Sequence, residues 1–249
     1  GGFTDFWGKL SINDNMSVLV GRTNAPFLLN RNGPVFNAAA EDICNPWVGR
    51  FDMIQYQVGG FTISAMNAKD KFENLQILSS ADIQTKKIKN IFPRLEAIFN
   101  HTFDDKFYIA AGGGIQIYKF EYGTDADSSI NVNSHILGLE LQGMFGPVTI
   151  TGRGTYGSNL GLYLPGVGGY NSRNPVFDRG QEEMLNNTSF SGFGGVKIKA
   201  ADAVAPGLGF GYTYQKHDVD AYSYPDEAMY LFANCEFIIM DHLTIYPEV

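Results

Sequence analysis

The best-defined pair of charged residues in this sequence lies within residues 136–156. Glu140 and Arg153 fall on the polar parity of this segment, and the other parity is apolar. Successive side chains of a strand point to opposite faces, so the pattern predicts two strands joined by a tight turn at residues 146–147. Counting back from that turn places Glu140 directly opposite Arg153. Opposite charges across a ladder stabilise it by about 0.2–1 kcal/mol.

Other charged residues recur at the polar parity of similar segments along the chain. Their chemistry is electrostatic: they can impose a field on a water-filled space and sort small solutes by charge and size. The alternative is a wall of ion pairs that satisfy one another and fill the interior. Eight residues form the candidate set: Lys9, Arg94, Glu96, Glu140, Arg153, Lys197, Lys199 and Glu236.

The overall composition excludes several classes of protein. Charged residues make up 18% of the chain, below the roughly 25% usual in soluble domains. The formal net charge of −8 argues against a nucleic-acid partner, which requires a basic surface. No run approaches the roughly 18 apolar residues of a membrane helix, so any membrane crossing must use strands. Cys44 and Cys235 have no metal-type spacing, and a disulfide between them is not favoured.

Alternation of apolar and polar residues predicts twelve strands. Pro93 weakens one of them, because proline cannot donate to a ladder. Arg50 and Asp52 fall on the apolar parity, so they must lie beyond the hydrocarbon or a bulge must intervene. The predicted strands are residues 3–12, 16–23, 48–58, 61–68, 90–100, 106–122, 136–145, 148–156, 190–200, 207–217, 228–239 and 243–249.

Short and long connections alternate along the whole chain. The predicted short turns are 13–15, 59–60, 101–105, 146–147, 201–206 and 240–242, and the long loops are 24–47, 70–89, 123–131, 157–189 and 218–227. Loop 70–89 has room for a short helix. Membrane barrels have this alternation, with short turns at one end and long loops at the other. The pattern therefore predicts an all-β, antiparallel, up-and-down transmembrane β-barrel that forms a single domain over residues 1–249.

The hairpin GKLSINDNMSVLVGR, residues 8–22, is similar to hairpins common in bacterial outer-membrane porin-type barrels, and the pattern of the whole chain resembles that family. The resemblance implies a bacterial outer-membrane location and lipid as a partner, with a homotrimer as one assembly. Such barrels usually end on a terminal aromatic residue, whereas this chain ends Tyr246-Pro247-Glu248-Val249. One further strand at each end would give fourteen, which we state as a hypothesis.

For a barrel of this family the expected function is passive diffusion of small hydrophilic solutes or ions, with no cofactor. We favour a pore over a filled wall, because a barrel of this size has more interior than its side chains occupy. Residues 157–189 and 24–47 are both candidates for a loop that folds inward and narrows the lumen. Arg153→Ala should shift ion selectivity toward cations. A second hypothesis is an adhesin or scaffold that acts through its long loops.

A third hypothesis is an outer-membrane hydrolase, which the histidines support poorly. His217 and Asp218 are similar to the acidic and histidine rim of outer-membrane proteases, but the acidic pair Asp104-Asp105 lies in a short turn at the opposite end. We therefore predict that the protein is not an enzyme. The acidic runs 125–127 and 178–183 lack calcium-loop spacing, and no metal is expected.

Overall fold

The computed structural model describes residues 5–27, 50–67, 76–78, 87–122, 128–160, 176–178, 181–217, 226–240 and 243–245. Within these ranges the chain is almost entirely β-strand, and none of them forms a helix long and apolar enough to cross a membrane. The strands are β1 (Phe6–Asn13), β2 (Met16–Asn24), β3 (Arg50–Val58), β4 (Phe61–Met66), β5 (Gln76–Leu78), β6 (Lys87–Asn90), β7 (Arg94–Phe103), β8 (Phe107–Tyr122), β9 (Ser128–Phe145), β10 (Val148–Ser158), β11 (Val176–Asp178), β12 (Glu183–Leu185), β13 (Asn187–Ile198), β14 (Val204–His217), β15 (Asp226–Met240) and β16 (Leu243–Ile245).

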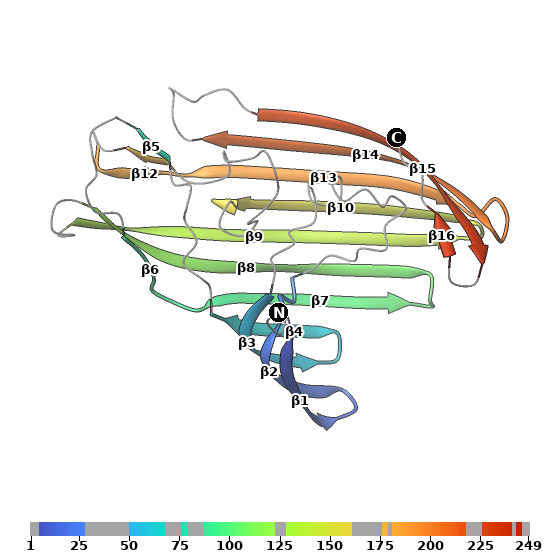
Figure 1. Ribbon diagram of the computed structural model, residues 1–249, viewed down its shortest axis with the longest axis horizontal. Coiled ribbons are helices and arrows are strands. Elements are labelled where there is room, and N and C mark those ends of the chain that lie inside the picture. The colour runs from blue at the N-terminus through green and yellow to red at the C-terminus, as the bar shows by residue number, and fades with distance from the viewer. Residues whose placement is uncertain are drawn as a thin grey trace.

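The main sheet follows the chain up and down. Its order is β1-β2-β3-β4-β7-β8-β9-β10-β13-β14-β15-β16, every neighbouring pair is antiparallel, and β6 also pairs with β8. The tight turns lie at one end of the curved sheet and the long connections at the other, on the right and left of Figure 1. Twelve strands lie on this path in the described residues, so the predicted all-β antiparallel architecture is confirmed.

Several predicted connections are shorter in the structure because the strands run on. The turn predicted at 101–105 is residues 104–106, and His101 lies within β7. Asp104 and Asp105 take positive φ angles of 49° and 54°, which aspartate tolerates better than most residues. The last residues of the loop predicted at 123–131 belong to β9, and the last residues of the turn predicted at 201–206 belong to β14.

Two segments predicted as loops contain short strands. Residues 70–89 include β5 and the first part of β6, and residues 157–189 include β11, β12 and the start of β13. β11 pairs with β5 in parallel and with β12 antiparallel, which joins the two segments in a small second sheet. The described part of 70–89 is therefore strand, not the short helix for which the loop has room. Most of loop 24–47 and Cys44 lie outside the described residues.

The strand predicted over residues 90–100 is broken at Pro93. β6 ends at Asn90 and β7 begins at Arg94, so residues 91–93 interrupt the edge that faces β8. Proline removes a ladder donor and fixes φ, which explains the break. Arg50 and Asp52 do lie on the same face as Ile54, since the β2–β3 register has no bulge. The bulge considered as one explanation is therefore absent from the β2–β3 pairing.

The predicted register of the β9–β10 hairpin is confirmed. Val148 pairs with Phe145, and Arg153 pairs with Glu140. We call the face that carries Glu140 and Arg153 the inner face, and the opposite face, which carries Leu139 and Ile150, the outer face.

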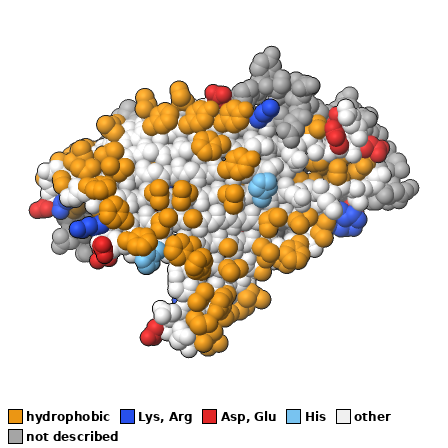
Figure 2. All heavy atoms as spheres, turned by 180° about the vertical axis from the view of Figure 1, so that it is seen from behind, with side chains coloured by type: hydrophobic (Ala, Val, Ile, Leu, Met, Phe, Trp, Pro, Cys, Tyr) orange, Lys and Arg blue, Asp and Glu red, His pale blue; other side chains and the backbone are white. Residues whose placement is uncertain are grey.

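The outer face is apolar and exposed. Leu139 is 44% exposed, Ile150 46% and Phe210 44%, although all three are large hydrophobic residues. Figure 2 shows hydrophobic side chains across this face and charged ones at its margins. At the short-turn end the rings of Phe107 and Phe145 meet edge to face, with centroids 5.6 Å apart. An exposed apolar surface of this extent is expected where a sheet contacts lipid.

Asn159 directly follows β10 and takes the left-handed conformation, with φ of 55°. Its side-chain amide donates to the carbonyl oxygen of Asn133 at 2.8 Å and to Oδ1 of Asn186 at 2.9 Å. Its Oδ1 accepts from the backbone N–H of Asn187 at 3.0 Å. This buried side chain therefore links β9 to the start of β13 beyond the end of β10.

Candidate functional site: the polar inner face

The inner face brings six of the eight predicted residues together as ion pairs. The pairs are Arg94–Glu96 on β7, Glu140–Arg153 between β9 and β10, and Lys197–Glu236 between β13 and β15. Lys199 lies just past the end of β13 and pairs with Asp202 of the next turn at 2.8 Å. Lys9 is exposed on β1. The sequence parity identified these residues but did not indicate which would pair, apart from Glu140 with Arg153.

The Arg94–Glu96 pair is fully enclosed. Arg94 Nε donates to Glu96 Oε1 at 2.8 Å, and the two side chains are 1% and 0% exposed. The Arg94 guanidinium also lies over the ring of Phe51, 5.2 Å from its centroid. Glu96 Oε2 accepts a hydrogen bond from the backbone N–H of Phe27 at 3.1 Å. The carboxylate is therefore held from two sides, as a buried charge requires.

The Glu140–Arg153 pair is equally enclosed. Arg153 Nε lies 3.1 Å from Glu140 Oε2, and the side chains are 2% and 0% exposed. On the strands that flank this hairpin, the ladder partner of Glu140 is Ala110 on β8, and that of Arg153 is Phe193 on β13. Phe193 is itself buried, and its ring centroid lies 6.2 Å from that of Phe232 on β15. Buried charges of this kind are tolerated because they are paired.

Between these two pairs, Phe27 packs onto the inner face. Its ring is completely buried, and a Cβ added to Gly138 would come within 2.6 Å of its Cζ atom. Glycine is required at that position because any side chain would displace the ring. Sequence analysis did not predict this contact, because a lone phenylalanine in a loop gives no local signal of its distant partner.

Both segments named as candidates for inward folding contact the inner face. Ala25 and Phe27 follow β2, and Leu160 follows β10. These residues form one buried apolar cluster with Met53, Met66 and Ile136 of the inner face. The choice between the two segments, which the sequence left open, is therefore not exclusive in the described residues: each contributes to the same cluster.

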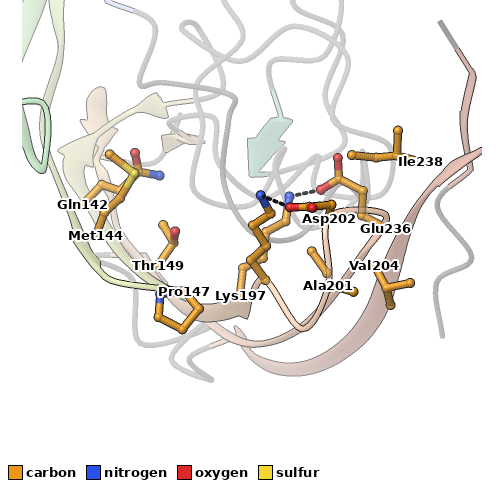
Figure 3. A pocket seen from close by; sticks show the side chains of 12 residues that line it. Gln142, Met144, Pro147, Thr149, Lys197, Ala201, Asp202, Val204, Glu236 and Ile238 are labelled. Atoms are coloured by element: carbon orange, nitrogen blue, oxygen red, sulfur yellow. Dashed lines mark hydrogen bonds and ion pairs between the residues drawn. The ribbon is translucent and has the colours of Figure 1, made fainter. Parts of the chain in front are cut away.

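The third ion pair is more accessible than the other two. The Lys197 and Glu236 side chains are 24% and 17% exposed. They face each other across β14, where the inner face carries only Ala205, Gly207 and Gly209. Figure 3 shows Lys197 and Glu236 on one side of a pocket and Gln142 and Thr149 on the other. The pocket has a volume of about 330 Å³ and lies beside the turns at residues 146–147 and 199–203.

The residues considered for catalysis do not come together in the described part of the chain. Asp104 and Asp105 lie in the turn between β7 and β8, whereas His217 is the last residue of β14, at the opposite end of the sheet. Asp218 lies outside the described residues. No group of three or more His, Cys, Asp or Glu suited to a metal ion occurs within the described ranges.

Similar proteins were found by structure only. No protein-family model matches the sequence, and no curated protein sequence matches it. The chain is similar to the outer membrane channel DcaP of Acinetobacter baumannii, with a TM-score of 0.70 and 16% identity over 94% of this chain and 64% of that one. It is also similar to OmpT, an outer membrane protein of Vibrio cholerae, with a TM-score of 0.56 and 10% identity over 98% of this chain and 68% of that one.

A trimer form of the same OmpT gives a TM-score of 0.51 and 12% identity over 94% of this chain and 65% of that one. The chain thus spans about two thirds of the length of these proteins. All of them are bacterial outer-membrane proteins. At these identities the likeness establishes the fold, and this chain has the fold of an outer-membrane β-barrel.

Proposed function

We propose that this chain forms the wall of a passive channel for small hydrophilic solutes or ions in a bacterial outer membrane. One observation carries the proposal: the burial pattern is inverted relative to a soluble sheet. The outer face exposes Leu139, Ile150 and Phe210, whereas the inner face buries Arg94, Glu140 and Arg153. A wall of this kind is stable only if lipid covers its outside.

The proposed mechanism requires no cofactor. A small polar solute in lipid must lose its hydrogen bonds to water, and a hydrated lumen removes that cost. The groups best placed to meet a solute are Lys197 and Glu236, because they are the partly exposed pair and line the pocket at the short-turn end. The fully buried pairs would act as the packed support behind the lumen. The likeness to DcaP, which is an outer membrane channel, supports this proposal by analogy of fold.

Planar-bilayer recording tests the proposal. The full-length protein should give stepwise, ohmic conductance, and protein unfolded by heat should give none. Swelling of liposomes that contain the protein should admit small sugars and exclude large polymers. A folded protein that inserts but neither conducts nor admits solutes would overturn the proposal and favour the adhesin or scaffold hypothesis.

Phe27, which packs onto the inner face, offers a second readout in the same experiment. Phe27→Ala removes a buried ring from the inner face, so single-channel conductance should rise while the protein remains folded. Gly138→Ala is the matched variant, because it should displace the ring while Phe27 itself is unchanged. Equal conductance in all three proteins would show that Phe27 does not limit the lumen.

That the protein is not an enzyme remains a prediction. The backbone of His217 pairs with that of Asn187. If the purified protein hydrolyses peptide or lipid substrates, the single variants His217→Ala and Asp218→Ala would show whether these residues are responsible. Trimerisation likewise remains a proposal, which crosslinking in native membranes tests.

A further inference from the structure

A group of charged residues lies on the outer face, at the long-loop end of the sheet. Lys89 on β6 and Lys119 on β8 are direct ladder partners, an arrangement of like charges that is unfavourable on its own. Glu121 relieves it: its Oε1 lies 2.6 Å from Lys89 Nζ and 3.5 Å from Lys119 Nζ. The three side chains together carry one net positive charge.

The two lysines of this cluster are exposed, whereas the acid is not. The Lys89 and Lys119 side chains are 47% and 40% exposed, and that of Glu121 is 7% exposed. Each ammonium group has three N–H donors, and one carboxylate oxygen engages only part of this capacity. The cluster therefore presents N–H donors and a surplus of positive charge toward whatever covers the outer face.

An apolar groove of about 610 Å³ begins one residue away from Lys89. Ile91 and Phe92, which lie in the break before Pro93, line this groove, and both side chains are about half exposed. The apolar walls include Val20, Ile54 and Ala65 from β2–β4, and Ile91, Phe92 and Pro93 from the break. A volume of this size lies within the range of sites for small ligands.

The other charged residues described near the groove are two acids and two arginines, so their formal charges sum to zero. Asp52 also lines it, and Arg22 is the direct ladder partner of Asp52. Arg50 pairs with Asp5 at 2.9 Å. The lysine cluster is therefore the part of the described surroundings that carries a surplus charge, and it is positive.

We propose that the groove and the lysine cluster together form a binding site for an anionic lipid of the leaflet at the long-loop end. The phosphate of the headgroup would accept hydrogen bonds from Lys89 and Lys119, and one acyl chain would lie in the groove against Phe92. The occupant is a lipid because the groove opens on the exposed apolar face and continues it through Val20 and Ile54. The lipid is anionic because exposed lysines at the boundary of the hydrocarbon attract phosphate.

Native mass spectrometry of the full chain refolded in detergent tests the site. The probes are dioleoyl-phosphatidylglycerol and dioleoyl-phosphatidylcholine, which have the same acyl chains and differ in headgroup charge. The anionic lipid should bind more tightly than the zwitterionic one. Lys89→Gln and Lys119→Gln should each weaken its binding about fivefold and leave the zwitterionic lipid unchanged. Glu121→Gln should strengthen binding of the anionic lipid, because it adds to the surplus positive charge.

Two further variants separate the headgroup from the groove. Ala65→Trp fills the groove without changing any charge, and it should weaken binding of the anionic lipid. Lys106→Gln removes an exposed lysine at the opposite end, in the turn between β7 and β8, and should leave binding of both lipids unchanged. Equal affinity for the two lipids, or wild-type binding by the Lys89→Gln/Lys119→Gln protein, would overturn the proposal. Charge-dependent binding that Ala65→Trp leaves untouched would also overturn it, because the groove would then take no part. Circular dichroism of each variant shows that it is folded.

Discussion

The inner face consists of two parts that use the same kinds of side chain differently. On β7–β10, two arginine–glutamate pairs are almost completely enclosed, and Phe27 packs between them. On β13–β15, the Lys197–Glu236 pair is partly exposed and spans β14 at the point where that strand carries Ala205, Gly207 and Gly209 on its inner face. The first part is packed like a protein interior, whereas water reaches the charged pair at the short-turn end of the second part.

This difference shows that the position of a charge in the alternation does not determine its role. A paired charge that water cannot reach contributes to the stability of the wall, and its loss leaves its partner buried and unpaired. A charge that water reaches contributes little to stability, but it can act on ions in the lumen. Of the two alternatives considered for the eight candidates, Arg94, Glu96, Glu140 and Arg153 fit the wall of satisfied ion pairs, and Lys197 and Glu236 remain the candidates for a field across a pore.

The largest expected effect is that of Arg153→Ala. It leaves Glu140 buried without its partner, so the free energy of unfolding should fall by about 3–5 kcal/mol. Urea unfolding in detergent, followed by tryptophan fluorescence, measures this loss. The double variant Glu140→Leu/Arg153→Met should recover most of the lost stability, because an apolar pair leaves no unpaired charge in the interior.

The same variant tests the selectivity prediction. A clear shift in reversal potential toward cation selectivity with little loss of stability would place Arg153 in the open lumen. It would contradict the distinction between a packed β7–β10 part and an accessible β13–β15 part. A large loss of stability with a small shift would support the packed assignment of β7–β10.

The next effect concerns the boundary between the two parts. Asn159→Ala leaves the backbone N–H of Asn187 and the carbonyl of Asn133 without the partner that now joins them. Unsatisfied buried groups cost about 1–3 kcal/mol, and the loss should fall on the long-loop ends of β9 and β13. Hydrogen exchange should show faster exchange there and no change at the short turns. Asn186→Ala is the control, since it removes one acceptor and leaves the backbone links intact.

Much of the fold was predictable because alternation is a local property. The β9–β10 register followed from a tight turn and a parity count, and the pairing of Glu140 with Arg153 followed from that register. The limits of strands were less predictable. β9 begins well before the residues that alternate most clearly, because pairing with β8 carries it on past the point where its own sequence shows a pattern.

The sequence indicated which charged residues lie on the inner face, but not how exposed each of them is. Exposure separates Arg153 from Lys197, and it depends on what packs over each residue. Phe27 comes from a distant loop, and the space near Lys197 exists because β14 carries glycines there. Neither cause lies within the strand that carries the charge, so neither could be inferred from that strand.

A smaller effect on stability, with a clear effect on current, is expected for Lys197→Met. The pair is partly exposed, so its loss should cost at most about 1 kcal/mol. Glu236 would then act on ions alone, and the reversal potential should shift toward cation selectivity, with Glu236→Gln shifting it the other way. Lys106→Met, in the exposed turn between β7 and β8, is the control for a change in net charge. Identical reversal potentials in these proteins would show that the β13–β15 part does not line the path of ions.

The smallest effect is expected at the short turn, for Asp202→Asn. The ammonium group of Lys199, hydrogen-bonded to Asp202, lowers the pKa of that carboxyl from its ordinary value. A lowered folded-state pKa contributes stability above the unfolded pKa, near 4, and the contribution is lost as the pH falls through the folded value. Because the side chains of Lys199 and Asp202 are 61% and 100% exposed, solvent and salt screen the pair, and the unfolding midpoint at pH 7 should not change measurably. The loss at Arg153 should persist in high salt. If Asp202→Asn proved as costly as Arg153→Ala, exposure would not be the property that separates packed from open charges in this wall.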